Sequence, residues 1–269
     1  MSVATPASRL AEAFARRPAG GLPGLIPYVT AGFPGRDDTP ALLATAERAG
    51  CLAVEVGIPF SDPLADGPTI QRSSQQALAN GMSVVGALAA VAEARSRGLS
   101  IPVIFMTYVN PVLAFGLERF CAEAAAVGAE AVIVPDLPDD EAVQLREAAD
   151  AAGLALILLV APTTTAARLE AACRRATGFV YCVGVTGTTG ARAHISQEAL
   201  DLLMRVKAVT SLPRALGFGL SRHEHIRALR GRAEAAVVGA ALIDRIGAAP
   251  RRPVEAAESF LVEMLGTAR

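Results

Sequence analysis

The sequence predicts a single-domain α/β protein folded as a (β/α)8 barrel, with an extra helix at its N-terminus. Two observations favour this fold. Short apolar runs alternate with Ala- and Leu-rich helical stretches at a spacing of roughly 30 residues, which is typical of repeated βαβ units. The apolar runs also lack a polar/apolar alternation, as expected of parallel strands that are buried on both faces. Eight such units most simply close into a barrel.

The apolar runs predict strands at residues 24–29, 52–56, 101–106, 131–134, 154–160, 179–183, 212–216 and 235–238. The stretches after them predict helices at residues 38–49, 83–97, 117–127, 140–152, 165–176, 196–209, 221–230 and 254–265. Before the first strand, Leu10 and Phe14 lie four positions apart, which indicates an amphipathic helix with Ser8 as its N-cap. We expect one domain over residues 1–269, in which a helix within residues 1–20 caps the barrel.

Two alternative interpretations fit the sequence less well. An open, doubly wound sheet would normally carry a Gly-x-Gly-x-x-Gly turn after its first strand, and residues 29–35 do not provide one. The Arg-rich segment 8–17 could belong to a transit peptide, but its helical spacing of apolar residues favours a structural helix.

The composition narrows the class of protein. Hydrophobic residues make up 52% of the chain, charged residues 19%, and the net charge is −1. This balance, together with 4% aromatic residues and no Trp, is unlike that of proteins that bind nucleic acids or membrane surfaces. The four cysteines lack a Cys-x-x-Cys spacing, so we expect reduced, buried thiols and a cytoplasmic location.

The most informative stretch is the second strand and the proline-rich loop that follows it. Glu55 is a charged residue in an otherwise apolar strand, and a buried charge is costly unless it is paired or used. Strand alternation places Cys51, Ala53 and Glu55 on one face and Leu52, Val54 and Val56 on the other. We expect Glu55 to point into the barrel, where burial raises a carboxyl pKa into the range useful for proton transfer.

The loop after this strand adds two more acids. Asp62 precedes a proline and is expected to organise a turn, whereas Asp66 has no helix of its own to cap and is expected to face a ligand. The connections at residues 57–71 and 184–193 are long or glycine-rich and follow strand ends, where barrel enzymes place their sites.

Glycine turns after the last two strands suggest a phosphate site. Gly217 and Gly219 follow the seventh strand, and Gly239 opens a helical turn after the eighth. Backbone amides at these two positions form the recurring phosphate site of barrels. Gly190 in the sixth loop could add a further amide. Tyr181, on the sixth strand, is explained equally well by core packing or by a role in the site.

The sequence gives little support for a metal site or for a Schiff-base lysine. His223 and His225 are two residues apart on a predicted helix, with no third ligand nearby, so we expect no metal site. The single lysine, Lys207, lies within a predicted helix, which argues against a Schiff-base mechanism.

Residues 54–71 closely resemble the signature of the tryptophan synthase α subunit family, and the resemblance covers essentially the whole chain. It continues in the motifs at residues 27–34, 108–111, 135–138, 186–190 and 217–219. The family implies a (β/α)8 barrel that cleaves indole-3-glycerol phosphate to indole and glyceraldehyde 3-phosphate. It also implies an α2β2 complex with a β subunit, which alone carries pyridoxal phosphate.

The resemblance also implies residue roles. Glu55 corresponds to the catalytic glutamate and Asp66 to the catalytic aspartate. The remaining positions implied in substrate binding are Tyr28, Tyr181, Thr189, Gly190, Phe218, Gly219, Gly239 and Ala240. The family commonly has serine where this chain has Ala240, so we expect weaker phosphate binding, unless another donor such as Arg192 replaces that serine.

Two other functions remain open from the sequence. The chain could be a stand-alone lyase that releases free indole, with the same residues and no β partner. It could also be a weakly active partner that mainly activates a β subunit, although the presence of both Glu55 and Asp66 speaks against this.

Overall fold

The computed structural model describes residues 6–184, 195–217 and 219–267. Within them, one parallel sheet has the strand order β5-β4-β3-β2-β1-β9-β8-β7-β6. The strands are β1 (Gly24–Thr30), β2 (Val54–Gly57), β3 (Val103–Met106), β4 (Ala131–Ile133), β5 (Ala155–Leu156), β6 (Leu158–Val160), β7 (Val180–Val183), β8 (Arg214–Gly217) and β9 (Ala235–Val238).

The sheet is a nearly closed barrel, and the predicted (β/α)8 fold is confirmed. β5 pairs with β4, and β6 pairs with β7. Only Ile157 separates β5 from β6, so the two pieces are the single strand expected at residues 154–160. Counting them as one strand gives the eight strands that the sequence predicts.

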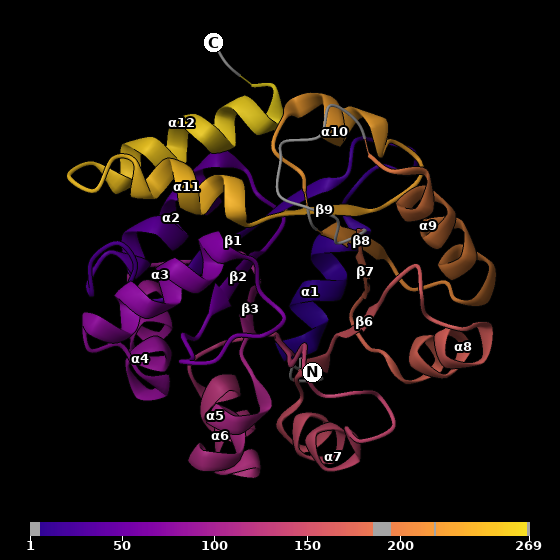
Figure 1. Cartoon of the computed structure of the whole chain (residues 1–269), viewed down its shortest axis with the longest axis horizontal. Helices are drawn as coiled ribbons and strands as arrows, with labels where there is room; N and C mark the ends of the chain where they lie inside the picture. The colour runs from indigo at the N-terminus through magenta and orange to yellow at the C-terminus, as the bar shows by residue number, and fades with distance from the viewer. Residues whose placement is uncertain (1–5, 185–194, 218, 268–269) are drawn as a thin grey trace.

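Apart from α1, the helices surround the strands in chain order (Figure 1). They are α1 (Pro6–Ala15), α2 (Thr39–Ala49), α3 (Pro68–Ala79), α4 (Val84–Ser96), α5 (Val109–Phe115), α6 (Leu117–Ala126), α7 (Val143–Ala152), α8 (Ala166–Arg175), α9 (Gln197–Val209), α10 (His223–Ala228), α11 (Ala240–Gly247) and α12 (Pro253–Leu265). α3 and α5 were not expected from the sequence. α10 is shorter than predicted, and the helical turn expected after the last strand is a full helix, α11.

Two apolar clusters divide the core. The larger lies between the strands and the outer helices. The smaller fills the barrel interior with inward residues such as Ile26, Ile104 and Phe179. The predicted faces before β2 were wrong at two positions, since Cys51 packs in the larger cluster and Leu52 joins Ala53 in the interior cluster. The strand begins only at Val54, so strict alternation does not extend back to Leu52.

α1 closes one end of the barrel. Leu10 and Phe14 are buried in the interior cluster, and the Phe14 ring lies 5.6 Å from that of Phe179. In Figure 1, α1 crosses the centre of the ring of helices. The helix begins at Pro6 rather than after Ser8, so Ser8 lies inside it and the predicted N-cap was wrong.

The described residues also bear on the cysteines and on membrane insertion. All four cysteines are free and buried, as expected. No single helix in the described ranges is long and apolar enough to cross a membrane. α3 and α4 meet the length and composition criteria only as a pair, and that pair is bent by 93°.

Candidate active site

Glu55 lies on the inner face of β2 and is almost completely buried, with 1% of its surface exposed. One of its carboxylate oxygens, Oε1, has no hydrogen-bond partner. Within the described ranges the side chain also forms no ion pair. Burial raises the pKa of Glu55 to about 8, because a low-dielectric surrounding disfavours the charged form. At neutral pH this carboxyl group is therefore protonated and can donate.

Asp66 lies at the end of the loop that connects β2 to α3. Its backbone is fixed by Gln71, which donates from Nε2 to the Asp66 carbonyl over 2.9 Å. Its carboxylate accepts a hydrogen bond of 2.9 Å from the hydroxyl of Tyr108. Burial raises the pKa of Asp66 to about 6, and the hydrogen bond from Tyr108 opposes that rise. Asp66 is therefore mainly ionised at neutral pH.

The chain has three tyrosines, and all three lie at this end of the barrel. Tyr28 on β1 is the register neighbour of Glu55. Tyr181 lies on β7, and Tyr108 follows β3. We call these three the site tyrosines. Burial raises the pKa of each, and the electrostatic interaction with Asp66 raises it further. The same interaction links Tyr28 and Tyr181 to Glu55, so these groups form one electrostatic cluster.

Two glycines make room for two of these rings. A β-carbon at Gly57 would lie 2.0 Å from the hydroxyl oxygen of Tyr28. A β-carbon at Gly217 would lie 2.1 Å from the hydroxyl oxygen of Tyr181. Both tyrosine rings thus lie over the inner face of the neighbouring strand, in space that any other residue would occupy.

The predicted phosphate turns lie beside this cluster. A β-carbon at Gly239 would be 3.5 Å from that of Tyr28, so the turn before α11 contacts the Tyr28 side chain. Ala240 is the first residue of α11, and the first amides of a helix have no carbonyl partner within it. Gly219 follows the neighbouring strand β8 and has a φ of +78°, which favours glycine.

The site residues therefore come from one continuous arc of the barrel, over strands β3-β2-β1-β9-β8-β7. The acids, the site tyrosines, Gly219, Gly239 and Ala240 all lie on these strands or directly after them. Thr189, Gly190 and Phe218 lie outside the described residues, as do Arg192 and most of the long loop after the sixth predicted strand. Asp62 forms a turn with its neighbours, through hydrogen bonds with Ser61 and Leu64.

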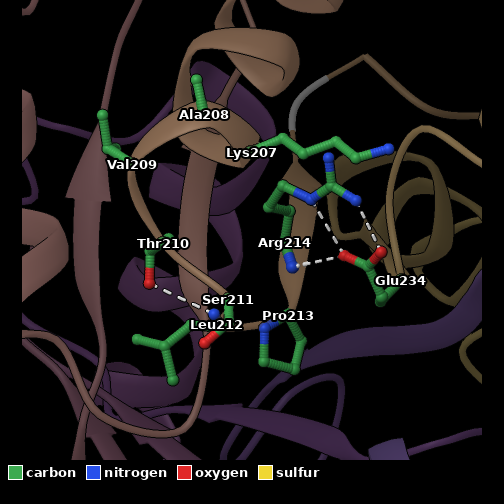
Figure 2. Close-up of a pocket in the computed structure, with 9 residues that line it drawn as sticks. All are labelled: Lys207, Ala208, Val209, Thr210, Ser211, Leu212, Pro213, Arg214 and Glu234. Carbon is green, nitrogen blue, oxygen red and sulfur yellow. Dashed lines mark hydrogen bonds and ion pairs between the residues drawn. The ribbon is translucent and has the colours of Figure 1, made fainter.

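A surface cavity of about 600 Å³ lies at the opposite end of the barrel (Figure 2). It is lined by residues that precede β8, by the first residue of β8, Arg214, and by Glu234 before β9, whereas the acids lie at or after the C-terminal end of β2. Its main charges pair with each other, since Arg214 donates from Nε and Nη2 to Glu234 over 3.1 and 2.6 Å. Arg214 also donates to the carbonyl of Leu203. The cavity thus surrounds a satisfied ion pair and offers no reactive group comparable to Glu55.

In the part of the chain that the structure describes, no three His, Cys, Asp or Glu side chains are grouped to hold a metal ion. Sequence reasoning missed one polar member of the site, Tyr108. Its position directly after β3, in a chain with so few tyrosines, was a signal that could have indicated it.

Comparison with known proteins gives consistent results. The family model described as tryptophan synthase alpha chain matches residues 14–267. A tryptophan synthase alpha chain of Chloroflexus aurantiacus is 47% identical over 259 residues, which cover 96% of this chain and 97% of that protein. One from Roseiflexus sp. is 46% identical over 243 residues, covering 90% of this chain and 93% of that protein.

Solved structures are similar as well. A chain from a structure of the tryptophan synthase α2β2 complex of Pyrococcus furiosus superposes with a TM-score of 0.86. It is 42% identical in sequence, and the match covers 92% of this chain and 98% of that chain.

Proposed function

The chain belongs to the tryptophan synthase alpha chain family, and on that premise we propose how its residues cleave indole-3-glycerol phosphate to indole and glyceraldehyde 3-phosphate. The family makes it a lyase of tryptophan biosynthesis. The observation that carries the assignment of roles is the pair of acids. Glu55 is buried without a charged partner, and Asp66 is ionised at neutral pH beside the same tyrosines.

Glu55 is the proton shuttle. With a pKa of about 8, its neutral carboxyl group can donate a proton to C3 of the indole ring. The bond between C3 and the glycerol carbon then breaks, and its electron pair returns to the ring. The carboxylate left on Glu55 takes the proton of the glycerol hydroxyl as that carbon becomes an aldehyde. Glu55 thus returns to its protonated form, the proton that it donated remains on C3 of the indole, and no external acid or base is consumed.

Asp66 stabilises the charge that this protonation creates. Adding a proton at C3 places positive charge on the indole nitrogen, and an ionised carboxylate at hydrogen-bond distance of that nitrogen stabilises it. Tyr28, Tyr181 and Phe218 would line the space for the indole ring. Tyr28 is the strand-register neighbour of Glu55, and both Tyr28 and Tyr181 interact electrostatically with the two acids, which supports this assignment.

The phosphate group would bind at the glycine turns. Gly219, Gly239 and Ala240 would donate backbone amides, with Thr189 and Gly190 completing the site. The contact between Gly239 and Tyr28 supports this arrangement, because it joins the phosphate end of the site to the indole end. The N-terminus of α11 also favours an anion.

The wider setting follows from the family. The α-type reaction proposed here uses acid and base groups of the chain alone, so we propose that this subunit works without a metal or organic cofactor. We also propose that the chain is one domain, acts in the cytoplasm, and assembles with a tryptophan synthase β subunit as α2β2. The Pyrococcus furiosus structures of such a complex support this partner.

The test is an indole-release assay on the purified chain with indole-3-glycerol phosphate. We expect Glu55→Gln and Asp66→Asn each to lower kcat on the order of 10²–10⁴-fold. Asp62→Asn, which makes the same change in the same loop at the turn-forming acid, should retain nearly full activity. Full activity in Glu55→Gln would overturn the proposed mechanism.

A stand-alone lyase is the second candidate, and the same assay separates the two. We expect a β subunit to co-elute with the chain in size-exclusion chromatography and to change the rate of indole release. A chain that is fully active alone and binds no β subunit would instead be a stand-alone enzyme.

A further inference from the structure

Tyr108 lies at the junction of β3 and α5, where it is the N-cap residue of the helix. Its side chain is buried, with 5% of its surface exposed, and it reaches the loop between β2 and α3. We propose that Tyr108 is a positioning residue that holds the Asp66 carboxylate in its orientation and ionised form. This inference rests on the proposed function, since it assumes that Asp66 faces the indole nitrogen.

The hydrogen bonds around the phenol have a definite direction. The backbone N–H of Ala65 donates to the Tyr108 oxygen over 3.1 Å. The Tyr108 hydroxyl then donates to Oδ2 of Asp66 over 2.9 Å. The phenol oxygen accepts from Ala65, and an ionised carboxylate can only accept. The hydroxyl proton of Tyr108 is therefore the one that forms the hydrogen bond to Asp66. A donor of this kind favours the charged form of its acceptor.

Packing holds the phenol in place. Its ring lies 5.5 Å from the ring of Phe60, measured between centroids, so Tyr108 contacts the loop at Phe60, Ala65 and Asp66. On the other side, the backbone N–H of Val109 donates to Asp136 over 2.9 Å. Asp136 follows β4, so the start of α5 is tied to the next strand of the barrel. The position of the Asp66 carboxylate is thus supported by residues that follow β3 and β4, and not only by its own loop.

The other titratable groups around Asp66 do not change charge in the same pH range. Tyr28 and Tyr181 interact electrostatically with Asp66, but burial raises the pKa of both phenols, so they stay neutral in acid and at neutral pH. Glu55 is neutral below about pH 8. Removing the Tyr108 hydroxyl should therefore affect the ionisation of Asp66 and leave that of Glu55 unchanged.

The test is Tyr108→Phe, which keeps the ring and its contact with Phe60 and removes only the hydroxyl. We expect kcat to fall about tenfold, with a smaller change in KM. The acidic limb of the kcat/KM profile should move upward by about one pH unit, while the alkaline limb stays in place. If Tyr108 had only a structural role, Tyr108→Phe would lower kcat/KM at every pH and leave both limbs at their wild-type pH values.

A double-mutant cycle with Asp66→Asn tests whether Tyr108 acts through Asp66. If Tyr108 acts through Asp66, adding Tyr108→Phe to Asp66→Asn should cost less than twofold, because the partner is already gone. A further tenfold loss in that background would overturn the inference, as would a wild-type acidic limb in Tyr108→Phe alone. If Asp66→Asn itself were fully active, the proposed role of Asp66 would fail instead. The two failures are therefore distinguishable.

Discussion

Two glycines decide where two of the site tyrosines can lie. Gly57 and Gly217 each take the position over which a tyrosine ring from the neighbouring strand leans. Neither glycine is required by a left-handed backbone, since neither has a positive φ. Their role is the empty space left by a missing side chain, through which a bulky ring reaches the centre of the barrel end.

The missing side chain at Gly57 allows a test of this packing. The β-carbon of Gly57→Ala would lie 2.0 to 2.6 Å from the hydroxyl and ring atoms of Tyr28, so the ring must move. We expect a loss of about 1–3 kcal/mol in unfolding free energy, measured by chemical denaturation, and a lower kcat. Gly67→Ala is the control for stability, because nothing lies within 4 Å of its added β-carbon. Equal stability in the two variants would contradict the packing argument.

The pKa values of the two acids predict that the enzyme is active over a limited pH range. Asp66 must be ionised, and it loses its charge below about pH 6. Glu55 must be protonated, and it loses its proton above about pH 8. A plot of kcat/KM against pH should therefore be bell-shaped, with limbs near these two values. A profile that is flat from pH 5 to 9 would show that at least one acid is assigned the wrong role.

At the scale of elements, an ion cluster ties α1 and α4 to the barrel. Glu130 precedes β4 and is fully buried. Its carboxylate pairs with Arg95 of α4 over 2.9 Å and with Arg9 of α1 over 2.8 Å. Glu130 also accepts from the backbone N–H of Val103 over 2.6 Å. This cluster lies at the N-terminal end of the strands, so it stabilises the end of the barrel opposite to the acids of the site.

Arg95 of α4 and Arg97, the C-cap residue of the same helix, give a matched test. Arg95→Ala should lower the unfolding free energy by about 3 kcal/mol, because it leaves much of a buried negative charge unpaired. Arg97→Ala removes only an exposed pair with Glu93, which is worth at most about 0.5 kcal/mol. Urea denaturation of both variants measures the difference. Similar losses would mean that the cluster contributes no more than a surface pair.

The N-terminus of α11 carries a second prediction at this scale. Ala240 opens the helix, and its N-cap Gly239 makes no side-chain capping bond. Ala240→Ser adds a hydroxyl beside the proposed phosphate site, and a hydrogen bond to a charged group is worth about 1.5–3 kcal/mol. We expect a lower KM for indole-3-glycerol phosphate at unchanged kcat, measured by steady-state kinetics. No change would indicate that another donor already fills this place.

At the scale of the whole molecule, the barrel joins residues that are distant in sequence. Tyr28, Glu55, Tyr108, Tyr181 and Gly239 span more than two hundred positions of the chain. They meet because closure of the sheet brings the ends of β3, β2, β1, β9, β8 and β7 side by side. A site built on so many strands depends on the register of each, so its geometry is a property of the complete barrel.

The sequence alone determined the eight strands, most of the outer helices and the inward direction of Glu55. These features follow from local periodicity and burial, which each short segment carries in its own residues. Where local signals competed, the predictions were less accurate. Leu52 lies inside because regular alternation begins only at Val54, and α1 starts before Ser8.

The tertiary structure alone decided which side chains meet. Nothing in the local pattern around Tyr108 indicates that its hydroxyl reaches Asp66. Likewise, the pattern around Gly57 does not show that Tyr28 leans over it. Such contacts depend on the stagger between neighbouring strands and on the path of the loops above them. Both are set by closing the barrel around its interior cluster, which is a condition on all strands together.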